Sequence, residues 1–301
     1  IDATWVPVTA RNVSTIALAG SDVYFGCPTG AASGPYVARV GASGSGTVDS
    51  SWNPSTDGAV NAIAVANNRV LIGGAFTGAG NVTRNKIAKL GADGAIDPSW
   101  NPNIAGGAGS VVTTIAVADG EVYFGGTFPS LNGGTTRNRI AKTSTSGSGV
   151  VDPTWNPNVT YSAGAASINS IAIAGSDVIF GGSFDGINGV VGLRRWIAKT
   201  PRTGNGSVDP DWNPNVDKAV VAVTVSGDSV LFGGTFTTVN GATPHRGLAK
   251  ASVQGTGLVD TTWHPDVASV ASIVVSGGEV FFGGAFSSRT HDHAGGVGHD
   301  L

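Results

Sequence analysis

The chain has 301 residues, of which 47 are glycine and only 12% are charged, with a formal net charge of −3. Disorder requires low hydrophobicity together with high charge, and neither holds, so a packed core is expected. No apolar run approaches the roughly 18 residues that span a bilayer, no basic block suggests nucleic acid or anionic lipid as a partner, and the single cysteine, Cys27, excludes an internal disulfide.

The predicted elements begin with a fragment, Ile1–Trp5, of the pattern V/I-D-x-x-W. A first repeat follows, with an alternating strand, a turn, a strand ending in "YFGC", a third strand "YVARV", and then "VDSSW". The same order recurs through 53–100, 101–155, 156–212 and 213–263. A sixth copy has its first two strands and a degraded third strand, "GVGHDL". One tryptophan marks each copy of the pattern: Trp5, Trp52, Trp100, Trp155, Trp212 and Trp263.

The first two strands of every repeat have a constant spacing. Nine positions separate the centre of the first strand from the residue before the glycine pair, and these centres are Ile16, Ile63, Ile115, Ile171, Val223 and Ile273. Such constancy predicts a β-hairpin, because one inserted residue would turn every side chain to the wrong face. Helical periodicity is found nowhere, so the chain is expected to be all-β.

Six four-stranded units of about 50 residues predict a single β-propeller domain over residues 1–301. An open solenoid is the alternative, since it uses similar repeats. The sixth repeat lacks a closing segment and Ile1–Trp5 supplies one, so we expect a six-bladed ring in which residues 1–5 complete the last blade. The tryptophans then have a structural role between neighbouring blades, and the paired glycines permit close sheet packing or a bulge.

The stretch "NNRVLIGGAFTGAGNVTRNKIAKLGADGAIDPSWNPN" resembles the delta-60 repeat, a propeller-type repeat of bacterial secreted and surface proteins. The residues that match its pattern are Gly73, Gly74, Phe76, Arg84, Ile87, Ala88, Asp93, Gly94 and Asp97, with Trp100 at the usual Phe position. The resemblance runs through all six units, although the first departs with "GCPTG" and the sixth loses its Arg and IAK element. It implies a surface or secreted location and no particular reaction.

The V/I-D-x-x-W segments, which we call the closing segments, carry one aspartate each: Asp2, Asp49, Asp97, Asp152, Asp209 and Asp260. One carboxylate per blade cannot converge on a single substrate atom. We therefore expect turn acceptors, or partners for the third-strand arginines Arg84, Arg137, Arg195 and Arg246. The repeating Lys89, Lys142, Lys199 and Lys250 are interpreted as solvated strand residues.

The remaining candidate sites are a histidine cluster and two long loops. His291, His293 and His299 lie in "THDHAGGVGHDL" and form a candidate metal set. Insertions at 103–112 and 158–169 enlarge the same face of adjacent blades, as binding loops often do, although neutral loop drift is equally compatible. Tyr161, Asn103 and Asn158 are the candidate binding residues there.

No nucleophile elbow, phosphate loop or calcium loop occurs, so no catalytic residue and no cofactor are predicted. The function expected is a non-catalytic extracellular or cell-surface scaffold that binds other surface proteins. A glycan-binding lectin is the alternative, and a metal-dependent enzyme built on the C-terminal histidines a distant third. The absence of methionine indicates a processed or partial chain from which any signal peptide has been removed.

Overall fold

The structure, a computed structural model, describes residues 4–7, 12–28 and 35–285. The chain divides into two compact units, Ile1–Arg137 with Ala141–Asp152, and Asn138–Ile140 with Pro153–Leu301. Each holds three of the six repeats, and the single domain expected over 1–301 stays a prediction. The described residues contain strands, turns and loops but no helix, and thus none with the length and apolar character needed to cross a membrane.

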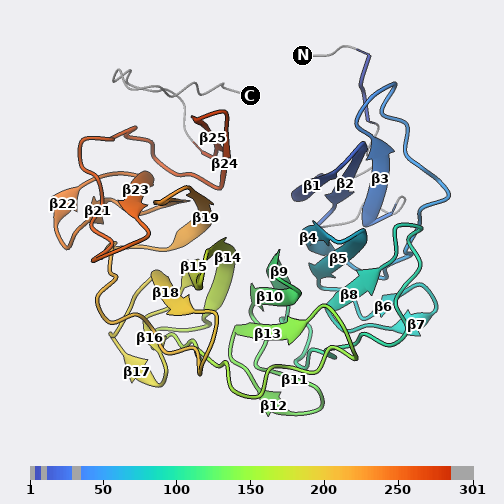
Figure 1. Cartoon of the computed structure of the whole chain (residues 1–301), viewed down its shortest axis with the longest axis horizontal. Coiled ribbons are helices and arrows are strands. Elements are labelled where there is room, and N and C mark those ends of the chain that lie inside the picture. The colour runs from blue at the N-terminus through green and yellow to red at the C-terminus, as the bar shows by residue number, and fades with distance from the viewer. Residues whose placement is uncertain (1–3, 8–11, 29–34, 286–301) are drawn as a thin grey trace. The chain divides into compact units, whose positions relative to one another are not determined.

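Each of the first five repeats forms a three-stranded antiparallel sheet (Figure 1). In the first unit the sheets are β1 (Thr15–Ala19), β2 (Asp22–Gly26) and β3 (Val37–Gly41); β4 (Val60–Ala66), β5 (Arg69–Gly74) and β8 (Ile87–Leu90); and β9 (Val112–Ala118), β10 (Glu121–Gly126) and β13 (Ile140–Ser144). In the second unit they are β14 (Ser167–Ala174), β15 (Asp177–Ser183) and β18 (Ile197–Pro201); and β19 (Val220–Ser226), β20 (Ser229–Gly234) and β23 (Leu248–Ser252). The sixth repeat contributes the hairpin of β24 (Ser272–Ser276) and β25 (Glu279–Gly283).

The second to fifth repeats each carry a small extra hairpin before the third strand, which the sequence pattern did not predict. These hairpins are β6 (Gly78–Ala79) with β7 (Val82–Thr83), β11 (Ser130–Leu131) with β12 (Thr135–Thr136), β16 (Gly186–Ile187) with β17 (Val190–Val191), and β21 (Thr238–Val239) with β22 (Thr243–Pro244). Two residues per strand are too few for a sequence signal.

The predicted hairpin register is confirmed. The residues nine positions apart are direct cross-strand partners in all six repeats: Ile16 and Phe25, Ile63 and Ile72, Ile115 and Phe124, Ile171 and Phe180, Val223 and Phe232, Ile273 and Phe282. Two-residue turns join the strands; in the second repeat, for example, Asn67 and Asn68 have φ of 50° and 58°, as a type I′ turn requires.

The expected fourth strand is reduced to a single bridge on the outer edge of the third strand. Val48 pairs with Val40 and Ile96 pairs with Leu90, and the third and fifth repeats repeat this bridge. The next residue explains the reduction. The Asp49 carboxylate accepts hydrogen bonds from the backbone N–H and the hydroxyl of Ser51, so the chain turns away at once.

The paired glycines serve both expected purposes. A methyl group on Gly74 would overlap the carbonyl oxygen of Ala59, where the first strand bulges between Val60 and Ala62. A methyl group on Gly73 would lie 2.5 Å from Val112 Cγ1 of the next repeat. The first glycine therefore permits close sheet packing and the second makes room for the bulge.

The tryptophans connect each closing segment to the repeat that follows it. Trp5 Nε1 donates to the Gly41 carbonyl at the end of β3, and Trp100 Nε1 donates to the Ser144 carbonyl at the end of β13, both at 2.8 Å. Trp155 and Trp212 make the same bond in the second unit, to Pro201 and Ser252. Trp52, Trp100, Trp155 and Trp212 are fully buried, whereas Trp5 and Trp263 are partly exposed.

Candidate functional site

The repeated aspartates are held by the lysines of the third strand. Lys89 Nζ lies 2.9 Å from Asp97 Oδ2 and donates to the Thr145 carbonyl of the next repeat. Lys142, Lys199 and Lys250 pair with Asp152, Asp209 and Asp260, and Arg39 takes the place of lysine in the first repeat. Partial burial raises the pKa of Asp97, but hydrogen bonds from Ser99 and Lys89 outweigh it and hold that pKa well below its usual value.

Two sequence interpretations are therefore wrong. Lys89, Lys142 and Lys199 are buried rather than solvated, because the next repeat or its own carboxylate partners cover them. The aspartates do act as turn acceptors, but their cationic partners are these lysines and not the arginines.

The arginines instead donate to backbone carbonyls at the start of the closing segment. Arg84 Nη2 lies 2.9 Å from the carbonyl oxygens of both Asp97 and Pro98. Arg137 reaches the Asp152 carbonyl in the same way, at 2.6 Å. We call this place, formed by those two carbonyls and the neighbouring tryptophan, the arginine socket. All three arginines that fill it, Arg84, Arg137 and Arg194, are buried.

In the fourth repeat the socket arginine is Arg194, not the predicted Arg195. Its Nη2 donates to the carbonyls of Asp209, at 2.9 Å, and Pro210. The adjacent Arg195 is exposed. The double arginine "RR" hid this register, which is found by counting back three residues from the start of the third strand.

In the fifth repeat the same count gives His245, not Arg246. The His245 ring is buried and its Nε2 donates to the Leu248 carbonyl at 3.0 Å, while Nδ1 has no hydrogen-bond partner. His264 replaces the asparagine that follows the tryptophan in the first four repeats, and its ring lies 4.5 Å from that of His245. Burial, and then the neighbouring His264, lower the pKa of His245.

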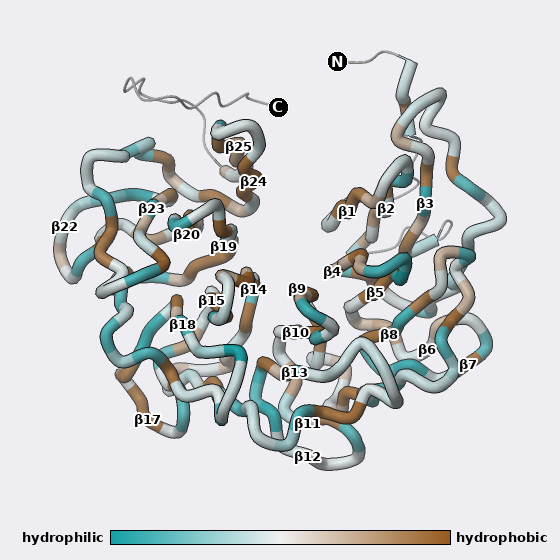
Figure 2. Tube along the Cα trace, in the orientation of Figure 1, coloured by the Kyte–Doolittle hydropathy of each residue, from teal (hydrophilic) through white to brown (hydrophobic). Residues whose placement is uncertain are grey.

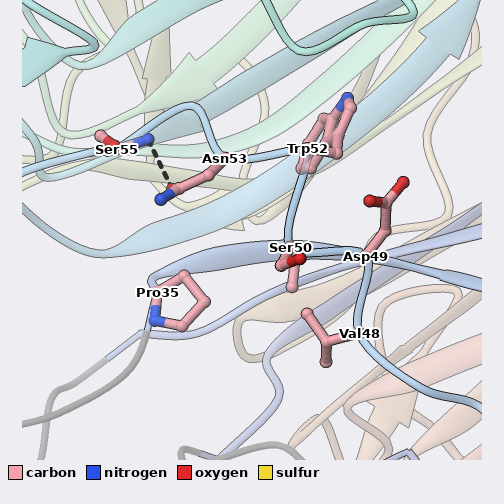
Figure 3. A pocket seen from close by; sticks show the side chains of 8 residues that line it. Pro35, Val48, Asp49, Ser50, Trp52, Asn53 and Ser55 are labelled. Atoms are coloured by element: carbon pink, nitrogen blue, oxygen red, sulfur yellow. Dashed lines mark hydrogen bonds between the residues drawn. The ribbon is translucent and has the colours of Figure 1, made fainter.

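The first repeat has a hollow at its socket. Three residues before β3 the sequence has Gly34, so this repeat supplies no arginine there. A cavity of about 460 Å³ is present, and the residues that line it are Pro35, Ala38, Val48, Asp49, Ser50, Trp52, Asn53 and Ser55. Figure 3 shows Pro35 on one side of this space, with Val48, Ser50 and Trp52 on the other. We call it the first-repeat hollow.

The hollow shares two side-chain-capped turns with the filled sockets. Asp49 Oδ1 accepts from the backbone N–H of Ser51 as Asp97 Oδ1 does from Ser99, both at 2.9 Å. Asn53 Oδ1 likewise caps the N–H of Ser55, as Figure 3 shows. By position in the repeat, the carbonyls of Asp49 and Ser50 correspond to those of Asp97 and Pro98, which receive a guanidinium. The Asp49 carbonyl also accepts from the backbone N–H of Trp52 at 3.2 Å, and a carbonyl oxygen has a second lone pair for a further donor.

The predicted loop residues lie in structural turns. Asn103 and Asn158 both have φ of 46°, and their Oδ1 atoms accept hydrogen bonds from Asn85 and Asn138 at 2.7 and 2.6 Å. Tyr161 is partly exposed, and its ring makes an edge contact with Trp196 at 5.5 Å between centroids. Asn103 belongs to one unit and the other two to the second, so their role as a binding set stays a prediction.

The predicted metal ligands His291, His293 and His299 fall outside the described residues. Within the described ranges, no three histidine, cysteine, aspartate or glutamate side chains are grouped to hold a metal ion.

The comparisons with known proteins agree with the architecture. Residues 66–99 match a family model described as a domain of unknown function (DUF5122) beta-propeller. The WD40 domain of Neurospora crassa Pan2 aligns with 88% of this chain and 69% of its own, at 10% identity and a TM-score of 0.55. A luciferin-regenerating enzyme aligns with 86% of this chain and 77% of its own, at 15% identity and a TM-score of 0.47.

No curated protein matches the chain. The family match covers one repeat, and the likeness to the Pan2 domain concerns the fold alone. Together with the all-β repeats, these findings support a β-propeller fold for the chain.

Proposed function

We propose that the chain is a non-catalytic β-propeller module that binds a segment of a partner protein in the first-repeat hollow. The observation that carries this proposal is a cavity of about 460 Å³ at a place that the second, third and fourth repeats fill with their own arginine. Small-ligand and peptide sites are typically concave, mostly apolar and equipped with a few fixed polar groups. Pro35, Ala38, Val48 and Trp52 supply the apolar walls of such a site.

A binding role also fits the use of the charged residues. The aspartates that close the second to fifth repeats are each paired with a third-strand lysine, so none of these carboxylates is poised as an acid or a base; they are Asp97, Asp152, Asp209 and Asp260. A surface or extracellular location, with other surface proteins as partners, forms part of the proposal and is favoured by the low charge and high glycine content. Membership of the delta-60 repeat family also forms part of the proposal.

We further propose a closed six-bladed ring. In the first repeat Val13 and Ile16 are 40% and 65% exposed, whereas their second-repeat counterparts Val60 and Ile63 are 0% and 9% exposed. Val60 and Ile63 are covered by the preceding repeat, with which they share a core. The brown colour of β1 in Figure 2 marks this apolar strand.

The sixth repeat has the matching face. Val274 and Phe281 are 56% and 38% exposed, whereas their first-repeat counterparts Ala17 and Tyr24 pack in the core shared with the second repeat. Among the described residues, no repeat therefore packs on this face of the first repeat or on that face of the sixth. Packing the two faces together, with residues 1–5 completing the last blade, would remove both from water and complete the ring.

The proposed binding function is tested by selecting a displayed library of random 12-residue peptides on the chain. The counter-selection uses Ser50→Trp, which places a large ring at the rim of the hollow. Ser50→Pro is the matched control, because proline occupies this position in three other repeats (Pro98, Pro153 and Pro210). Peptides that bind the parent and Ser50→Pro, but not Ser50→Trp, are expected. A library that yields none of these would overturn the proposal.

Glycan binding is a second candidate, favoured by the contact between Tyr161, on the enlarged fourth-repeat loop, and Trp196, directly before β18, both of which are partly exposed. Aromatic faces of this kind pack against the apolar faces of sugars. Its test is a glycan array with the parent chain and Tyr161→Ala. A specific signal that disappears in the variant would establish it, and no signal with the parent would remove it.

A further inference from the structure

We propose that the guest of the first-repeat hollow is an arginine side chain of the partner, bound through its guanidinium by the carbonyls of Asp49 and Ser50. This inference rests on the proposed function and names the chemistry of its ligand. The repeats themselves provide the template, since both equivalent carbonyls bind a guanidinium in the second and fourth repeats and the first of them, that of Asp152, does so in the third.

The geometry of the socket favours arginine over lysine. In the second repeat a single guanidinium nitrogen, Nη2, spans two carbonyl oxygens at 2.9 Å each, while Nη1 donates to the Thr83 carbonyl at 2.7 Å. A planar fork with five N–H donors can satisfy several acceptors at once, whereas an ammonium is a compact and strongly hydrated point charge. A socket of several neighbouring carbonyl oxygens therefore favours a guanidinium over an ammonium group.

The walls of the hollow suit the rest of an arginine side chain. Pro35, Val48 and Trp52 are apolar, and the three methylenes of arginine pack along apolar surface while the head remains on polar atoms. Ser50 and Asn53 are exposed at the mouth, so a chain can enter from solvent.

The nearby Arg39 does not exclude a second cation. It donates to Asp49 Oδ2 through Nε at 3.2 Å and lies 3.7 Å from Asp22. The second repeat tolerates the same pair of cations, because Lys89 occupies the Asp97 carboxylate while Arg84 occupies the Asp97 carbonyl. Hydrogen bonds from Ser51 and Arg39 hold the pKa of Asp49 well below its ordinary value, so the carboxylate remains charged and paired at neutral pH.

The test is calorimetric titration of the full chain with three probes. They are N-acetyl-arginine methylamide, its lysine counterpart and its citrulline counterpart, which keeps the shape of arginine but carries no charge. The arginine probe is expected to bind at least tenfold more tightly than the other two. Ser50→Trp should weaken it at least tenfold, and Ser50→Pro should leave it within twofold because the backbone carbonyl is retained.

Equal binding of arginine and citrulline by the parent chain would overturn the assignment, and this comparison does not depend on any variant folding. Unchanged arginine binding by a folded Ser50→Trp would overturn it too. The displayed peptides separate this failure from failure of the proposed function. Peptides that need an open hollow but contain no arginine would refute the guanidinium ligand and leave the binding function standing.

Discussion

At the scale of single residues, a largely buried ion pair and a more exposed one occupy equivalent places in different repeats. The side chains of Lys89 and Asp97 are 8% and 20% exposed, whereas those of Lys250 and Asp260 are 33% and 35% exposed. Removing one partner of a buried pair leaves a charge without compensation, and this costs far more than breaking a solvated pair. The two pairs allow this difference to be measured within one protein.

Lys89→Met is expected to lower the free energy of unfolding by about 2–4 kcal/mol, because Asp97 and the Thr145 carbonyl lose their cation. Lys250→Met is the matched control and should cost less than about 1 kcal/mol. Urea denaturation at pH 7 measures both. Equal losses would show that burial does not set the value of these pairs.

The histidine socket of the fifth repeat makes stability depend on pH. Burial and the neighbouring His264 lower the pKa of His245, so the folded state binds the proton less readily than the unfolded chain. The stabilisation is complete above the unfolded value of about 6.5 and is lost as the pH falls below it. The other charged groups near the pair are Asp260, Asp266 and Arg246.

Urea denaturation at pH 7.5 and 5.5 is expected to show the parent losing more stability at the lower pH than His245→Arg/His264→Asn. This double variant places at the two positions the residue types that the second repeat has there, those of Arg84 and Asn101. His264→Asn alone keeps the titrating buried ring and should keep part of the effect. Identical losses in the parent and the double variant would contradict the prediction.

At the scale of elements, the glycine pair is the most constrained feature of the hairpin. Gly74→Ala would place a methyl group on the carbonyl of Ala59, and backbone cannot move aside as a flexible side chain can. A loss of about 3 kcal/mol or more is expected in urea denaturation. Gly107→Ala is the control, because its added methyl group meets open space, and it should change stability by less than about 0.5 kcal/mol. A tolerated Gly74→Ala would contradict the bulge geometry.

The hairpins could be predicted from sequence because their determinants are local. The nine-residue spacing fixed which residues pair, and asparagine and glycine provided the positive φ of the turns. The burial of Lys89 could not be predicted in this way, since part of its cover, the Thr145 carbonyl, comes from the next repeat. Arg84 and Arg137 were identified, but the fourth- and fifth-repeat residues were missed by one position, because "RR" and "HR" each offer two basic residues and only three-dimensional packing selects between them.

The first-repeat hollow corresponds to a departure from the repeat pattern in the sequence. Its "GCPTG" departs from the repeat, and the stretch between the second and third strands is shorter than in the second repeat and supplies no arginine three residues before β3. What the departure means depends on knowing where Arg84 goes, which is a contact with the closing segment. An absence can be interpreted only after the filled sockets have been seen.

At the scale of the whole molecule, one glycine tests the proposed ring. Gly283 is the counterpart of Gly73 and Gly181, at which an added methyl group would meet a valine of the next repeat at 2.5 Å, whereas at Gly283 it meets nothing within 4 Å among the described residues. If the sixth repeat packs on the first, Gly283→Ala should clash with Val13 and cost about 1–3 kcal/mol, as Gly73→Ala should in its own interface. Urea denaturation at two protein concentrations, with light scattering to establish a monomer, measures the cost and separates closure within one chain from association of two. If Gly283→Ala left the free energy of unfolding unchanged while Gly73→Ala lowered it, no repeat would pack against the Phe281 face. The proposed ring would then be refuted.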